Sequence, residues 1–95
     1  MNYAPSLEIS AMFQTTVLTS LFQNLLYESG PGVKEDIIAS FLPFHTEIGV
    51  GEDFLRQLLE DLGNGEIGSV RNFAGHLARS PMAFYSVWRV IYGIS

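Results

Sequence analysis

The chain has 95 residues, a length that fits one small domain, and we expect residues 1–95 to fold as a single unit. Its composition is 47% hydrophobic, 13% aromatic and only 16% charged, which argues against intrinsic disorder. The sequence has no cysteine, which excludes a disulfide framework, a thiolate metal site and a cysteine nucleophile.

The net charge of −5 is unevenly distributed along the chain. Residues 1–66 contain all ten acidic residues and two basic ones, whereas residues 67–95 contain three arginines and no acid. Such polarity is balanced within the fold, across a dimer, or by a charged partner. The adjacent acid pairs at 35–36, 52–53 and 60–61 suggest, as a hypothesis, a surface for a basic partner.

Residues 6–27 predict the longest helix, around which we expect the others to pack. The segment has no glycine or proline, and no charge from Ile9 through Tyr27. Ser6 is the predicted N-cap. Apolar residues recur at helical intervals and form one stripe, which comprises Leu7, Ala11, Leu18, Leu21, Phe22 and Leu25.

The same segment is long enough to span a bilayer, but two Gln, one Asn and five Ser or Thr residues interrupt it between Ile9 and Tyr27. Those polar groups would be costly in hydrocarbon, so we expect no membrane span. The N-terminus also lacks the basic segment of a signal peptide, and we therefore expect a cytoplasmic protein.

The middle of the chain predicts three further helices, at about residues 33–42, 52–62 and 70–78, with a loop over residues 43–51. Leucines repeat at helical spacing in the second of these, and Arg56 has Glu52 and Glu60 one turn away on either side. Ser69 is a possible cap for the third helix. The fold class is therefore all-α, a compact bundle of four to five helices around a long N-terminal helix.

Ser80 and Pro81 open the last helix as its N-cap and first residue. This helix is apolar nearly all round, which is typical of an element buried on more than one side. We predict that it forms an interface with another protein or a second copy, through Phe84, Tyr85, Val87, Trp88, Ile91 and Tyr92. The alternative is that these side chains form part of the monomer's own core.

Residues 69–88 resemble a helix-turn-helix motif. The positions that fit are an alanine inside the first helix, the Ser-Pro cap and the apolar residues around them: Ala74, Leu77, Ser80, Pro81 and Tyr85. Two positions depart from the pattern, because Ala78 stands where the turn usually has glycine and Arg79 follows where an apolar residue is expected. The resemblance implies a DNA-binding regulator that uses Arg71, Arg79, Tyr85 and Arg89, but a pI near 4.7 opposes binding to phosphates.

No motif of catalysis or of metal binding stands out in the sequence. Residues 52–78 have the helix–loop–helix outline of an EF-hand, but Leu62 and Arg71 occupy positions that need ligand oxygens. His45 and His76 are the only histidines, and their spacing fits no zinc motif. We therefore expect no enzyme activity, no metal and no cofactor.

The sequence thus favours a small, acidic, non-catalytic interaction or regulatory protein that forms a homo-oligomer through its C-terminal helix. A helix-turn-helix DNA-binding regulator is the alternative interpretation.

Overall fold

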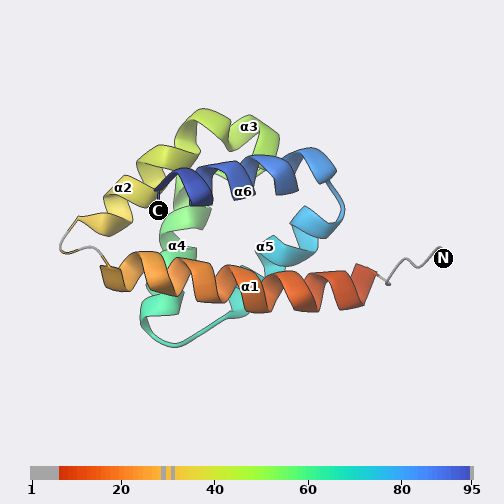
Figure 1. Ribbon diagram of the computed structural model, residues 1–95, viewed down its shortest axis with the longest axis horizontal. Helices are drawn as coiled ribbons and strands as arrows, with labels where there is room; N and C mark the ends of the chain where they lie inside the picture. Colours follow the sequence, from red (N-terminus) through yellow and green to blue (C-terminus); the bar gives the residue numbers. More distant parts are fainter. Residues whose placement is uncertain (1–6, 29, 31, 95) are drawn as a thin grey trace.

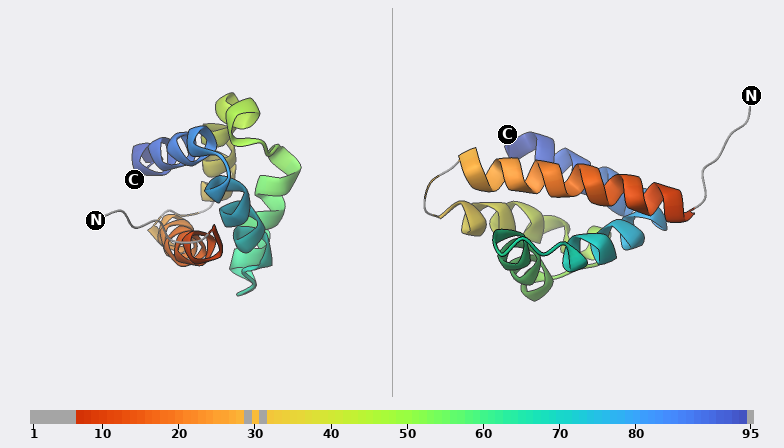
Figure 2. Two further views of the ribbon diagram at one scale, coloured as in Figure 1. Left: turned by 90° about the vertical axis from the view of Figure 1, so that its right-hand side faces the viewer. Right: turned by 90° about the horizontal axis from the view of Figure 1, so that it is seen from below.

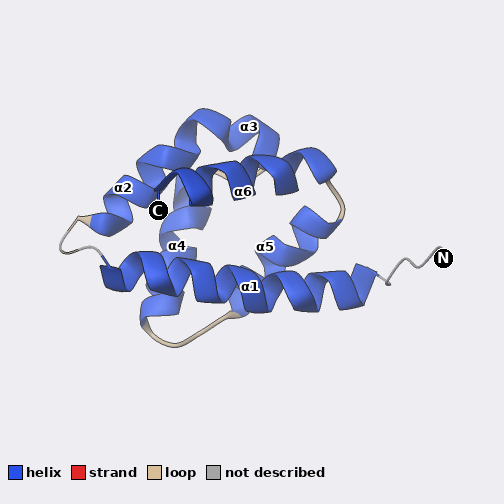
Figure 3. Ribbon diagram, viewed as in Figure 1, coloured by secondary structure: helices blue, strands red, loops and turns tan. Residues whose placement is uncertain are grey.

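The computed structural model describes residues 7–28, 30 and 32–94, and every regular element within these ranges is helical (Figure 3). In chain order the elements are α1 (Leu7–Glu28), α2 (Val33–Phe41), the 3₁₀ helix η1 (Leu42–Phe44), α3 (His45–Ile48), α4 (Glu52–Gly63), α5 (Gly68–Ala78) and α6 (Pro81–Ile94). The predicted all-α fold is confirmed. Five of these helices have 9 to 22 residues, and α3 is a single turn.

The long helix α1 packs chiefly against α5 and also contacts α2, α4 and α6. Its predicted stripe is confirmed at Leu18, Phe22 and Leu25, which are buried. The Phe22 ring lies 6.0 Å from the Phe41 ring of α2, centroid to centroid. The side chains of Leu7 and Ala11, and the predicted cap Ser6, lie outside the described residues.

The helices form two layers that enclose one core. In Figure 1, α1 and α6 lie nearest the viewer and run in the same direction, with α4 behind them, and the turned views of Figure 2 agree. The core is made of side chains from every α-helix. Its largest members are Leu18, Phe22, Ile37, Phe41, Ile48, Leu55, Leu58, Leu59, Val70, Phe73, Leu77 and Ile91.

The segment expected as a loop, residues 43–51, is largely helical. Pro43 has no amide hydrogen and stops the α-helical bonding of α2, but it fits the start of the 3₁₀ helix η1. Nδ1–H of His45 donates to the carbonyl of Leu42, 2.9 Å away, and α3 begins there. The prediction of a loop was wrong because Ile48 is buried, and this tertiary contact stabilises a turn too short to be stable alone.

Of the two predicted serine caps that lie within the described residues, Ser80 is confirmed and Ser69 is wrong. The Ser80 hydroxyl accepts a hydrogen bond from the amide of Ala83 at 3.3 Å, and Pro81 is the first residue of α6. In contrast, α5 begins at Gly68, and the Ser69 hydroxyl donates to the carboxylate of Asp61 at 2.6 Å. Ser69 therefore ties α5 to α4 instead of capping its own helix.

Gly49 ends α3 in a left-handed conformation, with φ of 78°. A Cβ at this position would lie only 2.5 Å from Nε2 of His76, which packs against Gly49 from α5. Gly65, in the turn after α4, has a similar φ of 80° but has no atom within 4 Å of such a Cβ. Two glycines with the same backbone conformation thus differ in one tertiary contact.

We expect Gly65→Ala to lower the free energy of unfolding by about 1–2 kcal/mol, the cost of a left-handed alanine. Gly49→Ala should cost roughly 1–3 kcal/mol more, because the methyl group also displaces the His76 ring. Urea denaturation of both variants measures the difference. Adding His76→Ala should bring the cost of Gly49→Ala down to that of Gly65→Ala; an unchanged cost would show that the ring does not matter.

Candidate functional site

The inner face of α6 is part of the core, and the residues that form it decide what the outer face presents. Ala83, Val87, Val90 and Ile91 are buried, and so is Ser86, whose side chain is 4% exposed. The Ser86 hydroxyl donates to a carboxylate oxygen of Glu47 in α3, 2.6 Å away. This hydrogen bond gives the buried hydroxyl the polar partner that it needs.

The outer face of α6 carries three large side chains that remain exposed. Met82, Tyr85 and Tyr92 are 67%, 64% and 65% exposed, and Arg89 lies between the two tyrosines and is also exposed. We call Met82, Tyr85, Arg89 and Tyr92 the outer stripe. The set of residues predicted for the interface did not include Met82, although its spacing of three residues from Tyr85 places both side chains on one face of the helix.

Both tyrosines of the outer stripe are held by neighbouring side chains. The guanidinium carbon of Arg89 lies 5.6 Å from the centre of the Tyr85 ring, within the range of a cation–π contact. The Tyr92 ring stacks on Trp88 at 5.8 Å, and Trp88 meets the Phe84 ring edge-on at 5.4 Å. Rings restrained in this way lose less conformational entropy when a partner binds.

Trp88 lies at the boundary between the core and the outer stripe. Its ring is half-buried, and its indole Nε1–H is buried without a hydrogen-bond partner. A buried donor without a partner is destabilising by roughly 1–3 kcal/mol, which the packing of the ring must offset. Trp88 is the chain's only tryptophan, so its fluorescence reports on this boundary.

The structure divides the six residues predicted for the interface between core and surface. Val87 and Ile91 are buried in the core, Phe84 and Trp88 are half-buried, and only Tyr85 and Tyr92 are exposed.

The residues of the helix-turn-helix interpretation are all exposed, but they come from three places. Arg71 lies on α5, Arg79 in the turn, and Tyr85 and Arg89 on α6. In a helix-turn-helix motif the N-terminal part of the second helix contacts the bases, and in this part of α6 Ala83 and Ser86 are buried. The outer stripe therefore offers a nucleic acid one cation, Arg89.

Arg56 forms two ion pairs, with Glu35 of α2 and with Glu52 of α4. Its guanidinium donates two hydrogen bonds to Glu35 of α2, at 2.7 and 3.2 Å, and one to Glu52 at 2.8 Å. The hydrogen bond from Arg56 lowers the pKa of Glu35 below its ordinary value, against an opposing effect of desolvation. The expected pair with Glu52 is confirmed, but Arg56 turns to Glu35 instead of Glu60.

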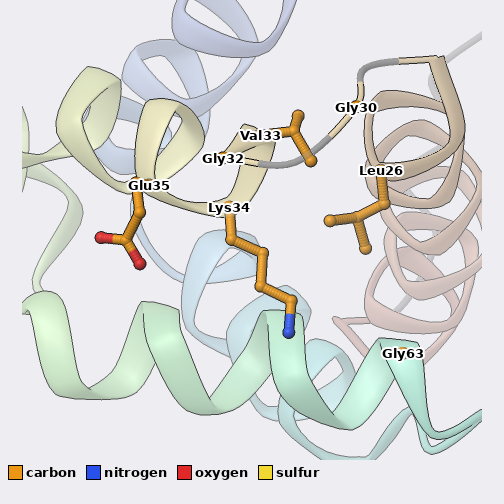
Figure 4. A pocket seen from close by; sticks show the side chains of 7 residues that line it. All are labelled: Leu26, Gly30, Gly32, Val33, Lys34, Glu35 and Gly63. Atoms are coloured by element: carbon orange, nitrogen blue, oxygen red, sulfur yellow. The ribbon is translucent and has the colours of Figure 1, made fainter.

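Two pockets meet where α1 ends and α2 begins. The larger has a volume of about 440 Å³ and is lined by Leu26, Gly30, Gly32, Val33, Lys34, Glu35 and Gly63. The smaller, about 160 Å³, shares Leu26 and Gly63 with it and adds Gln23, Tyr27 and Leu62. Figure 4 shows the Lys34 ammonium extending towards α4, while the Glu35 carboxylate turns away from the pocket.

Among the lining residues that the structure describes, Lys34 is the one cation and Glu35, which Arg56 already engages, is the one carboxylate. These described residues include no histidine, serine or paired acid that would supply a nucleophile with a base. Across the described residues, no three His, Asp or Glu side chains converge in a way that would hold a metal ion. We therefore take the outer stripe of α6 as the candidate functional site.

Comparisons with protein-family models, with curated proteins and with solved structures found no match to this chain. Among the described residues, no helix combines the length and the hydropathy needed to cross a membrane.

The division of α6 into core and outer stripe predicts unequal effects of substitutions on stability. Ile91→Ala should lower the free energy of unfolding by about 2–5 kcal/mol, because it leaves a cavity in the core. Tyr85→Ser should change it by less than about 0.5 kcal/mol, because the side chain is mostly in solvent. Urea denaturation followed by Trp88 fluorescence measures both; comparable losses would contradict the assignment of Tyr85 to the surface.

Asp61 supplies a second prediction. Hydrogen bonds from Ser69, and secondarily from Gln57, lower the pKa of Asp61 below its ordinary 3.8. A lowered pKa in the folded state means that the unfolded state binds more protons, so stability falls as the pH drops through the folded pKa. Ser69→Ala should raise the pKa of Asp61 and flatten this loss. NMR titration of the Asp61 carboxyl carbon tests it, and Gln57→Ala should raise the pKa less.

Proposed function

We propose that this is a small, non-catalytic interaction or regulatory protein that binds another protein surface, a second copy included, through the outer stripe of α6. The observation that carries the proposal is the exposure of Met82, Tyr85 and Tyr92 on a helix whose opposite face is already buried. The fold does not need these side chains in its core. Aromatic residues, methionine and arginine are the residue types enriched at the centres of protein interfaces.

The restraint of the outer stripe supports the same function. Tyr85 lies under Arg89, and Tyr92 stacks on Trp88, which in turn packs on the core. Two amphipathic rings in set positions present apolar area together with hydroxyl groups. Such anchors contribute most of the binding energy where a partner excludes water from them.

A helix-turn-helix DNA-binding regulator is the second candidate. Its support is the Ser80 cap at the start of α6, together with exposed arginines at 71, 79 and 89 in a part of the chain that has no acid. DNA binding depends on neutralising phosphates, and the net charge of −5 opposes it. The outer stripe, with two tyrosines, one methionine and one arginine, is closer in composition to a protein interface.

Crosslinking in living cells tests the proposal. A benzophenone amino acid placed at Tyr85 should form adducts with one discrete protein in the cells that make this chain. The same group at Tyr27 of α1, which is 87% exposed, is the matched control and should form none. Adding Tyr92→Ser should remove the adduct at position 85.

Equal protein adducts at positions 85 and 27, or none at 85, would overturn the proposal. Adducts at position 85 with nucleic acid instead of protein would overturn it in favour of the second candidate.

A further inference from the structure

The outer stripe has a spacing that reads the same from both ends. Its members stand at positions 82, 85, 89 and 92, so successive intervals are three, four and three residues. Intervals of three and four place all four side chains along one face of α6. The midpoint of the stripe lies at the level of Val87, which faces the core.

A symmetric spacing permits two copies of α6 to pair in opposite directions about a two-fold axis at that midpoint. Met82 then lies opposite Tyr92 of the second copy, and Tyr85 lies opposite its Arg89. A two-fold interface repeats every contact, so these are two methionine–aromatic pairs and two arginine–tyrosine pairs. Both kinds of pair are attractive, the first through the sulfur and the second through the cation and the ring.

We propose that the partner of the outer stripe is a second copy of this chain, bound as an antiparallel α6–α6 pair. This inference rests on the proposed function. The chemistry of the stripe matches itself: each side chain that one copy presents meets a complementary one on the other. A head-to-tail contact between the arginines of one copy and the acids of α2 and α4 in the next would instead build rings or open-ended chains.

The length of α6 limits the strength of this dimer. Fourteen residues at about 1.5 Å each make a helix of about 21 Å, and a contact along one such helix is small for a stable complex. We therefore expect a weak, reversible dimer.

The charge of the stripe gives the dimer an unusual dependence on salt. In the antiparallel pair, Arg89 and its symmetry mate are separated by about 6 Å along the helix axes, because each lies two residues from the axis of symmetry. Added salt screens their repulsion and should strengthen the dimer. Binding of Arg89 to nucleic acid, or to acidic side chains, would instead weaken as salt is added.

Sedimentation velocity from about 1 µM to about 1 mM tests the dimer over the range that a weak association requires. The expected result is a monomer–dimer equilibrium that shifts towards dimer as salt is raised. Tyr85→Ala should weaken the dimer at least tenfold, since it removes two symmetric contacts, while Tyr27→Ala on α1 should leave it unchanged. A monomer throughout, species larger than a dimer, or equal effects of the two variants would overturn the inference.

Disulfide trapping tests the antiparallel arrangement, and the absence of cysteine from the chain makes each introduced thiol unique. A mixture of Met82→Cys and Tyr92→Cys proteins should form a mixed disulfide dimer on mild oxidation, because positions 82 and 92 face each other. Each variant alone should crosslink at least tenfold more slowly, since like positions are about 15 Å apart along the axes. Faster crosslinking of either variant alone would overturn the antiparallel arrangement.

The crosslinking experiment of the previous subsection separates the two proposals. A purified protein that stays monomeric, together with adducts at position 85 to a different protein, overturns the second copy as partner and keeps the interaction function. Loss of all protein adducts at position 85 overturns both.

Discussion

The rotation of α6 about its own axis is the constraint on which the candidate site depends. Small and branched side chains, Ala83, Val87, Val90 and Ile91, lie against the core, and the Ser86 hydroxyl bonds to Glu47 of α3. A rotation by one residue in one direction would bury the Arg89 charge, which is costly. A rotation in the other direction would turn Ser86 away from Glu47 and break their hydrogen bond. Because the inner face is set in this way, the outer stripe is presented to solvent.

The short helix α3 connects the turn after α2 to this constraint. Pro43 ends the α-helical bonding of α2, and His45 then begins α3. This turn carries both Glu47, which holds α6, and Ile48, which enters the core. α3 packs on α6, and Gly49 at its end lies against His76 of α5. A segment with little helical propensity of its own thus orients the helix that carries the candidate site.

Acidic side chains form contacts between helices, whereas Arg89 near the C-terminal end stays exposed on the surface. Arg56 joins α2 to α4 by bonding Glu35 and Glu52, and Asp61 joins α4 to α5 through Ser69. These contacts engage part of the acidic charge in structure. In contrast, Arg89 makes its described contact with a tyrosine ring, so its positive charge remains available at the surface. Several carboxylates therefore serve to join helices, whereas Arg89 is part of the proposed binding surface.

The amino-acid sequence alone determined the fold class and the places where the helices lie. Leucine and phenylalanine at intervals of three and four identify α1, α4 and α5, and the Ser80 cap with Pro81 marks the start of α6, because these effects are local to each segment. The sequence also predicted that α6 forms an interface. It did not distinguish the two faces of α6, because a helix that is apolar nearly all round satisfies helical periodicity in several rotations.

Only the tertiary structure decided which rotation is adopted. It buried Ser86, which the sequence marks as polar, because Glu47 lies 39 residues away in the chain but next to it in space. It placed Val87 and Ile91 in the core, exposed Tyr85 and Tyr92, and added Met82 to the surface. Likewise it converted residues 43–51 from an expected loop into η1 and α3, and turned Arg56 towards Glu35 instead of Glu60. Each of these outcomes depends on contacts between distant segments, whose energies exceed the local preferences that the sequence displays.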